Sequence, residues 1–222
     1  MMDASTYEKI TGTKVRYDIL YKYESVSDMV RKYGKGDIDL LDVGCAFGIF
    51  SFFADKGWKI HGIDRNPERI AKAKRSTLGN ATFNVGDAET FETGKKFDVV
   101  IALDIIEHLV HPDACLKRIS DSLKREGLLV VSNPNYFSAW NVLNFFFRLE
   151  DHRHWWNPSE FVRMAEKHGF TLLEMKPRPM LSEAIGWAIR DYRPFYGLDK
   201  KLGSLFPRFS TGWFLVFRKA AN

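Results

Sequence analysis

Cysteine is scarce in this chain of 222 residues, which contains only Cys45 and Cys115. No CxxC pair exists, so a structural zinc site is not expected, and a reducing cytosol is the expected setting. No apolar stretch reaches the roughly 18 residues that a membrane-spanning helix needs. The first ten residues include Asp3 and Glu8 and have no apolar run, which argues against a signal peptide. Together these absences predict a cytoplasmic protein without a metal.

The composition is that of an ordinary globular protein, with 45% hydrophobic and 27% charged residues. A length of 222 residues fits one α/β domain with a substantial core, and we expect a single domain over residues 1–222. The net charge of +5 is mildly basic. It permits nucleic acid, an anionic membrane surface or an acidic substrate as partner and does not choose among them.

Short apolar runs alternate with amphipathic stretches from about residue 39 onward. Strands are expected at Asp39–Val43, Lys59–Ile63, Ala81–Val85, Phe97–Ala102, Leu128–Ser132, Thr171–Lys176 and Gly212–Arg218. Helices are expected at Ile19–Tyr33, Gly48–Lys56, Pro67–Ser76, Pro112–Lys124 (closed by Gly127) and Pro158–His168. This alternation predicts a parallel sheet with helices on both faces, which binds ligands at the carboxyl ends of its strands.

Three of those strand ends carry the residues that a nucleoside ligand requires. The first strand runs into Asp42, then Gly44, then Gly48 opening a helix, and glycine lets a ligand approach the backbone closely. Asp64 ends the second strand 20 residues after Gly44, where a carboxylate can take both ribose hydroxyls. Asp87 follows the third strand, where it can accept a hydrogen bond from an adenine amine. A tight turn, a helix cap and a turn carboxylate would explain each alone, but three in succession favour a binding site.

The turn at residues 44–48 distinguishes between two classes of cofactor. Dinucleotides require GxGxxG, with the pyrophosphate on a helix N-terminus, whereas this turn reads GCAFG and is one glycine short. S-adenosylmethionine (SAM) carries no phosphate, so the looser turn suits it better. These features favour SAM over a dinucleotide.

Four motifs resemble those of the class I SAM-dependent methyltransferases. LDVGCAFG is similar to the first motif, which usually has Gly where Ala46 stands; HGID and GDAE resemble the second and third. FDVVIALDIIEHLVHP resembles the fourth in the form shared by ubiquinone-biosynthesis O-methyltransferases and related glycolipid and small-molecule methyltransferases. The resemblance covers residues from about 37 to 219.

The resemblance implies a Rossmann-like α/β fold with seven strands, the last one antiparallel and beside the fifth. It implies SAM as cofactor and S-adenosylhomocysteine (SAH) as product. The cofactor-binding residues that it implies are Asp42, Gly44, Cys45, Ala46, Gly48, Asp64, Arg65, Asp87, Ala88 and Leu103.

Candidate catalytic residues follow the fourth strand. His108 can serve as a base for a hydroxyl acceptor, because an imidazole titrates near neutral pH, and Glu107 precedes it. The pair can equally form only the wall of the pocket. His152 and His154 are further candidates, or residues of the pocket rim.

Three segments fall outside the alternation: a helical cap at residues 1–36 and insertions at 135–156 and 177–210, which we expect to shape the acceptor site. A nearly all-apolar helix is expected at Tyr136–Leu149, either buried against the domain or a partner, or acting as a lid. Residues 176–219 combine nine Lys and Arg with aromatic residues, as at an anionic membrane surface or on RNA. The leading hypothesis is O-methylation of a small or lipid-linked acceptor, with peripheral membrane contact. The alternatives are an RNA methyltransferase and a non-catalytic SAM-fold protein.

Overall fold

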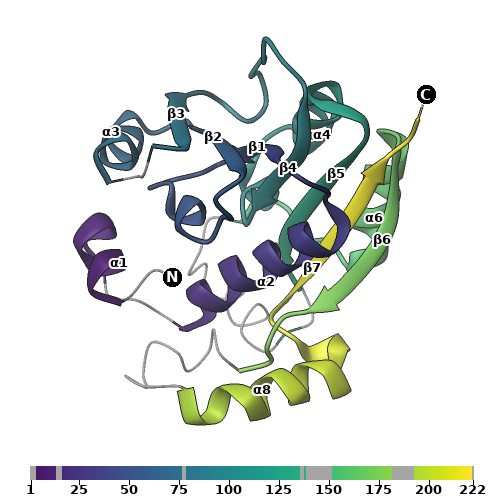
Figure 1. Cartoon of the computed structure of the whole chain (residues 1–222). Coiled ribbons are helices and arrows are strands. Elements are labelled where there is room, and N and C mark those ends of the chain that lie inside the picture. The colour runs from purple at the N-terminus through teal and green to yellow at the C-terminus, as the bar shows by residue number, and fades with distance from the viewer. Residues whose placement is uncertain are drawn as a thin grey trace.

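A seven-stranded sheet forms the centre of the computed structural model, which describes residues 4–13, 17–76, 79–135, 138, 152–181 and 193–221. The strands are β1 (Ile38–Val43), β2 (Trp58–Asp64), β3 (Ala81–Val85), β4 (Phe97–Leu103), β5 (Leu123–Pro134), β6 (Phe170–Pro177) and β7 (Gly212–Lys219). Their order is β3-β2-β1-β4-β5-β7-β6 (Figure 1). Strands β1 to β5 run parallel, and β7 lies antiparallel between β5 and β6. The predicted mostly parallel sheet, with its last strand beside the fifth, is confirmed.

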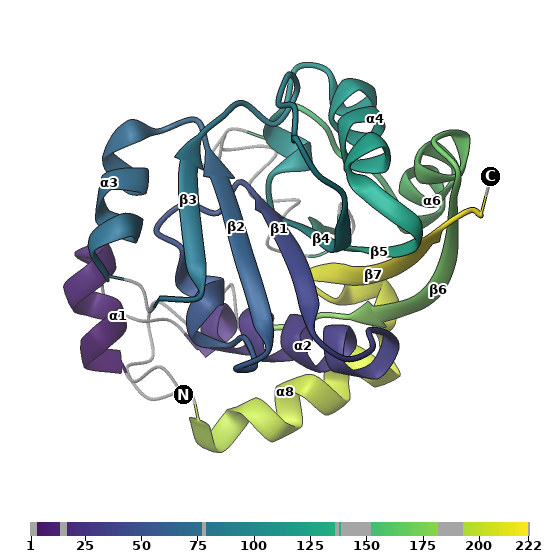
Figure 2. The same ribbon diagram turned by 45° about the horizontal axis from the view of Figure 1, so that its top comes forward.

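Helices cover both faces of this sheet (Figure 2). They are α1 (Ala4–Thr11), α2 (Tyr17–Tyr33), α3 (Pro67–Ser76), α4 (Pro112–Ser122), α6 (Pro158–Lys167) and α8 (Arg193–Leu205), with short 3₁₀ turns η1 (Ile49–Phe52), η2 (Ile106–His108) and η3 (Pro207–Phe209). Successive strand residues point to opposite faces, so Leu41 packs with Cys115 of α4 and Phe161 of α6, while Leu40 packs with Val30 of α2. The apolar runs of the sequence are therefore buried on both sides, as a covered parallel sheet requires.

One predicted helix does not form, and another ends earlier than predicted. The segment predicted as a helix over Gly48–Lys56 forms only the 3₁₀ turn η1. Its consecutive apolar residues Ile49 and Phe50 enter two different core clusters, which a helix with a single buried stripe does not allow. The helix predicted to reach Lys124 ends at Ser122, because Leu123 is extended and begins β5, so Gly127 lies inside the strand and does not close the helix.

The N-terminal cap consists of two helices. Helix α2 confirms the prediction of helix around residues 19–33, and α1 lies within the helical cap predicted at residues 1–36. Tyr7 and Ile10 of α1 pack against Ile49 and Phe53, so the cap covers the segment that follows β1. The cap is thus placed to border any ligand at the end of that strand.

The insertion at 177–210 contains α8 and η3, which lie along the edge of the molecule (Figure 1). The helix predicted at Tyr136–Leu149 lies outside the described residues. In the described ranges, no helix combines the length and the apolar character needed to cross a membrane.

Candidate active site

A cleft of about 340 Å³ lies where β1, β2, β3 and β4 end. This volume is in the range of small-molecule sites. Six residues singled out by the sequence line it: Gly44, Asp64, Arg65, Asp87, Ala88 and His108. The structure therefore brings together the ends of three strands and the segment that follows the fourth, as the sequence predicts.

The turn after β1 is held open by its backbone. Gly44 has φ +78°, and the N–H groups of Gly44 and Cys45 both donate to the carbonyl of Ile63 on β2, at 2.8 and 2.9 Å. A Cβ on Gly44 would lie 2.9 Å from the side chain of Ile105. Glycine is thus required here both for the left-handed backbone and for space.

Asp64 connects this turn to β2. Its Oδ2 accepts from the N–H of Ala46 at 3.0 Å, and its Oδ1 accepts from the N–H of Asn66 at 2.8 Å. Asn66, and not Asp64, caps α3 by accepting from the N–H groups of Glu68 and Arg69. Since a carboxylate offers about four acceptor positions, Asp64 retains two for a ligand, which suits a ribose diol.

The loops after β3 and β4 are joined across the cleft. Asp87 accepts from the N–H of Glu89 at 2.7 Å, and Glu89 Oε1 accepts from the N–H groups of Val110 and His111 at 2.6 and 3.1 Å. Asp87 itself is exposed, so its second oxygen can receive a ligand donor. Sequence reasoning missed Glu89, because no local signal marks a contact with residues 21 and 22 positions away.

Asp42 lies behind the cleft wall and is only 5% exposed. Burial raises the pKa of its carboxyl to about 7; Lys22 lowers this pKa and Asp64 raises it further. Asp42 therefore influences the cleft through its charge, without lining it.

Three other predicted cofactor residues contribute through packing. The Cys45 side chain packs in the core with Ile70, Ala73 and Phe83, and burial raises the pKa of its thiol. Gly48 has φ +69°, and a Cβ there would lie 2.6 Å from the Phe83 ring. Leu103 packs against the core cluster on the α2 side of the sheet. The backbone of this region shapes the cleft while these side chains face the interior.

A buried ion network follows β4 and was not found from the sequence. Asp104, with φ +50°, accepts from Lys22 Nζ at 2.8 Å, Arg178 Nη1 at 2.8 Å and Ser132 Oγ at 2.7 Å. Burial opposes ionisation of Asp104, but Arg178 and Lys22 more than offset it and hold the pKa of this carboxyl well below its usual range. The network joins α2, β5 and the segment after β6 to the cleft residue Asp104.

Glu107 and His108 form the 3₁₀ turn η2 next to this network. Glu107 is 1% exposed, and burial first, then the nearby Asp104 charge, raises the pKa of its carboxyl well above the usual value. His108 lines the cleft, and its ring centroid lies 4.8 Å from that of His152. His154 instead contacts the carbonyl of Leu109 through Nε2 at 3.0 Å, so it serves to hold the loop in place.

Comparisons with known proteins identify the family of this chain. A family model described as a methyltransferase domain matches residues 16–175. The ubiquinone biosynthesis O-methyltransferase of Colwellia psychrerythraea is 26% identical over 188 residues, 78% of this chain and 76% of that protein. The corresponding protein of Pelagibacter ubique is 28% identical over 153 residues, 63% of this chain, and the match spans 64% of its length, just under two thirds.

A solved structure shows the same fold. Magnesium protoporphyrin IX methyltransferase from Synechocystis, determined with bound SAH, superposes with a TM-score of 0.69 at 17% identity, covering 97% of this chain and 94% of that one. The chain thus belongs to the methyltransferase domain family, with the fold and cofactor class of the SAM-dependent methyltransferases.

Proposed function

We propose that this protein transfers the methyl group of SAM to an oxygen atom of a small or lipid-linked acceptor, such as a quinone precursor or a glycan. The observation that carries the proposal is the single cleft in which Asp64 and Asp87 meet His108. The similarity to ubiquinone biosynthesis O-methyltransferases supports oxygen as the accepting atom.

The proposed cofactor residues lie at the ends of different strands, and each is proposed to bind a different part of SAM. Asp64 has acceptor positions left for the ribose hydroxyls, Asp87 for the adenine amine, and the glycine turn lets the ligand approach the backbone. When bound, SAM supplies a methyl group that is already activated on a sulfonium. The protein's task is then to align the acceptor and exclude water.

His108 is the proposed proton acceptor for a hydroxyl substrate, because it lines the cleft beyond the cofactor residues. Glu107 lies behind it and is too buried to reach solvent. We propose that Glu107 positions the histidines around it.

A lipid-linked acceptor is supported by the surface of α8 and η3. Five large apolar side chains are more than half exposed there: Phe195, Leu198, Leu205, Phe206 and Phe209. Lys200, Lys201 and Arg208 are exposed on the same elements. Apolar side chains among cations suit the surface of an anionic membrane, so we propose peripheral membrane contact for a protein otherwise in the cytoplasm.

Calorimetric titration with SAM tests the cofactor half of the proposal. Wild-type protein should bind one SAM per chain, Asp64→Ala should bind far more weakly, and the exposed control Asp28→Ala should bind as wild type. Absence of binding by the wild type would refute the proposal.

Methyl transfer from labelled SAM to cell extract tests the acceptor half. Label should enter the lipid or small-molecule pool. Label found only in RNA would establish the RNA methyltransferase alternative, and no label in any pool despite SAM binding would favour the non-catalytic alternative.

A further inference from the structure

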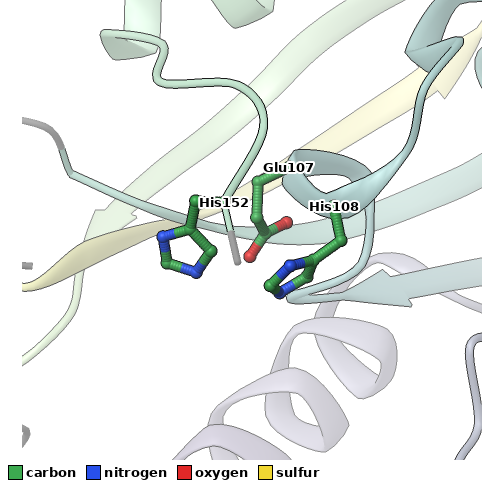
Figure 3. A group of neighbouring side chains, drawn as sticks. All are labelled: Glu107, His108 and His152. Carbon is green, nitrogen blue, oxygen red and sulfur yellow. The ribbon is translucent and has the colours of Figure 1, made fainter. Parts of the chain in front are cut away.

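Glu107, His108 and His152 bring one carboxylate and two imidazoles together beside the cleft (Figure 3). One possible ligand atom from each residue lies within 4.8 Å of the others. We propose that these three residues bind a divalent transition-metal cation, zinc or one of similar ligand preference, which contacts the methyl acceptor. Only the contact with the acceptor rests on the proposed function; cation binding stands without it.

The Glu107 carboxylate is the first observation that points to a ligand. It is 1% exposed, and within the described part of the chain its Oε2 makes no hydrogen bond. A buried carboxylate oxygen without a partner carries a large desolvation cost. Figure 3 shows this carboxylate between the two imidazole rings. A cation bound to this carboxylate would offset its desolvation cost.

The loop that carries His152 is fastened to the Glu107 turn. The carbonyl of Glu107 accepts from the N–H groups of Arg153 and His154 at 2.9 and 3.1 Å, and His154 Nε2 bonds to the Leu109 carbonyl at 3.0 Å. Trp155 packs edge-on against the His152 ring, with centroids 4.8 Å apart. These bonds fix two segments against each other, as an outer shell does around a metal site.

The ligand set indicates which kind of cation fits. Two imidazoles and one carboxylate are a common catalytic zinc set, whereas magnesium prefers oxygen ligands and water. Bonds of about 2.1 Å in a tetrahedral site place ligand atoms about 3.4 Å apart. Binding therefore requires the side chains of the half-buried His108 and His152 to rotate toward the cation by the remaining distance.

Because the site borders the cleft, the cation would keep one coordination position open to a ligand. His108 and Arg153 both line the cleft, so one side of the cluster faces the bound ligand. With a cation present, His108 acts as a ligand and not as the base. A hydroxyl that coordinates to the cation loses its proton to solvent more readily, because the metal lowers its pKa.

Titration with Zn²⁺ alone tests this inference. Tag-free, EDTA-treated full-length protein without SAM should bind one Zn²⁺ per chain by calorimetry, and Co²⁺ should give visible absorption bands typical of a tetrahedral site. His152→Ala should weaken Zn²⁺ binding by roughly 100-fold or more, since loss of a mere outer-shell partner already costs 10- to 100-fold. Mg²⁺ should not compete at equal concentration.

The matched control is His111→Ala, an exposed histidine three residues beyond His108, which should bind Zn²⁺ as wild type does. If His152→Ala is misfolded by circular dichroism, Glu107→Gln, which keeps the side-chain shape, replaces it with the same expectation. No Zn²⁺ binding by the wild type, or equal binding by wild type and the folded site variant, would overturn the proposal. SAM titration of the same metal-free protein separates this result from a failure of the proposed function.

Discussion

The buried carboxyl of Asp42 gives the stability of this protein a pH dependence that an Asp42→Asn variant should remove. Burial raises the pKa of this group to about 7 in the folded protein, from an ordinary value of 3.8. The folded state therefore binds this proton more tightly than the unfolded chain does. The resulting stabilisation is fully present below pH 3.8 and is lost as pH rises through 7.

The size of the effect follows from the pKa difference. Each pKa unit corresponds to about 1.4 kcal/mol, so ionising Asp42 costs the fold up to about 4 kcal/mol by pH 8. Asn has nearly the same shape and never ionises. Other groups, Glu107 among them, titrate in both proteins, so the informative quantity is the difference between variant and wild type.

Guanidinium unfolding of both proteins at pH 5, 6.5 and 8 measures this difference. The stability of Asp42→Asn relative to wild type should rise by a few kcal/mol from pH 5 to pH 8. Asp28→Asn is the control: its exposed ion pair with Arg31 is worth at most about 1 kcal/mol, and the difference should stay flat. A flat difference for Asp42→Asn as well would refute the reasoning.

Three further predictions follow from the packing and charges around the cleft. Gly48→Ala should destabilise the fold by about 2–5 kcal/mol in guanidinium unfolding, because φ is +69° and the new Cβ meets the Phe83 ring at 2.6 Å; an unchanged midpoint would contradict this. Arg178→Met should cost about 3 kcal/mol at pH 7 and less at pH 3, because the unfolded chain is protonated at Asp104 there and the folded variant, without Arg178, takes up this proton more readily than wild type; an equal cost at both pH values would contradict this. Cys45, which is 4% exposed and has a raised thiol pKa, should react with a thiol reagent only when the protein unfolds; rapid labelling of the native protein at pH 8 would show otherwise.

The strands and the strand-end residues of the cleft could be predicted because their signals are local. A buried parallel strand is a short apolar run, and the residue that ends it lies at the ligand edge of the sheet. Asp64 and Asp87 were therefore located by counting along the chain, and the structure places both at one cleft. Gly44 was located in the same way, because only a glycine there permits the turn and leaves space for Ile105.

Helix ends were harder to predict than helices. Apolar residues after Gly48 predicted a helix, but burial in two separate clusters left only a 3₁₀ turn. Leu123 could by its residue type end helix α4 or begin strand β5. Its pairing with Phe97 on β4 places it in the strand. Such decisions depend on which neighbours are present in the folded protein.

By itself, the sequence determined the class of fold and which strand-end residues line the cleft, since each depends on residues close together in the chain. Only the tertiary structure decided what surrounds the side of the cleft that follows β4. Asp104 accepts hydrogen bonds from Lys22 and Arg178, which lie 82 and 74 residues away in the sequence. Glu107 and His108 lie close to His152, although a long insertion separates them in the chain. Contacts of this kind are set by the packing of whole helices and strands against one another, and no spacing along the chain encodes them.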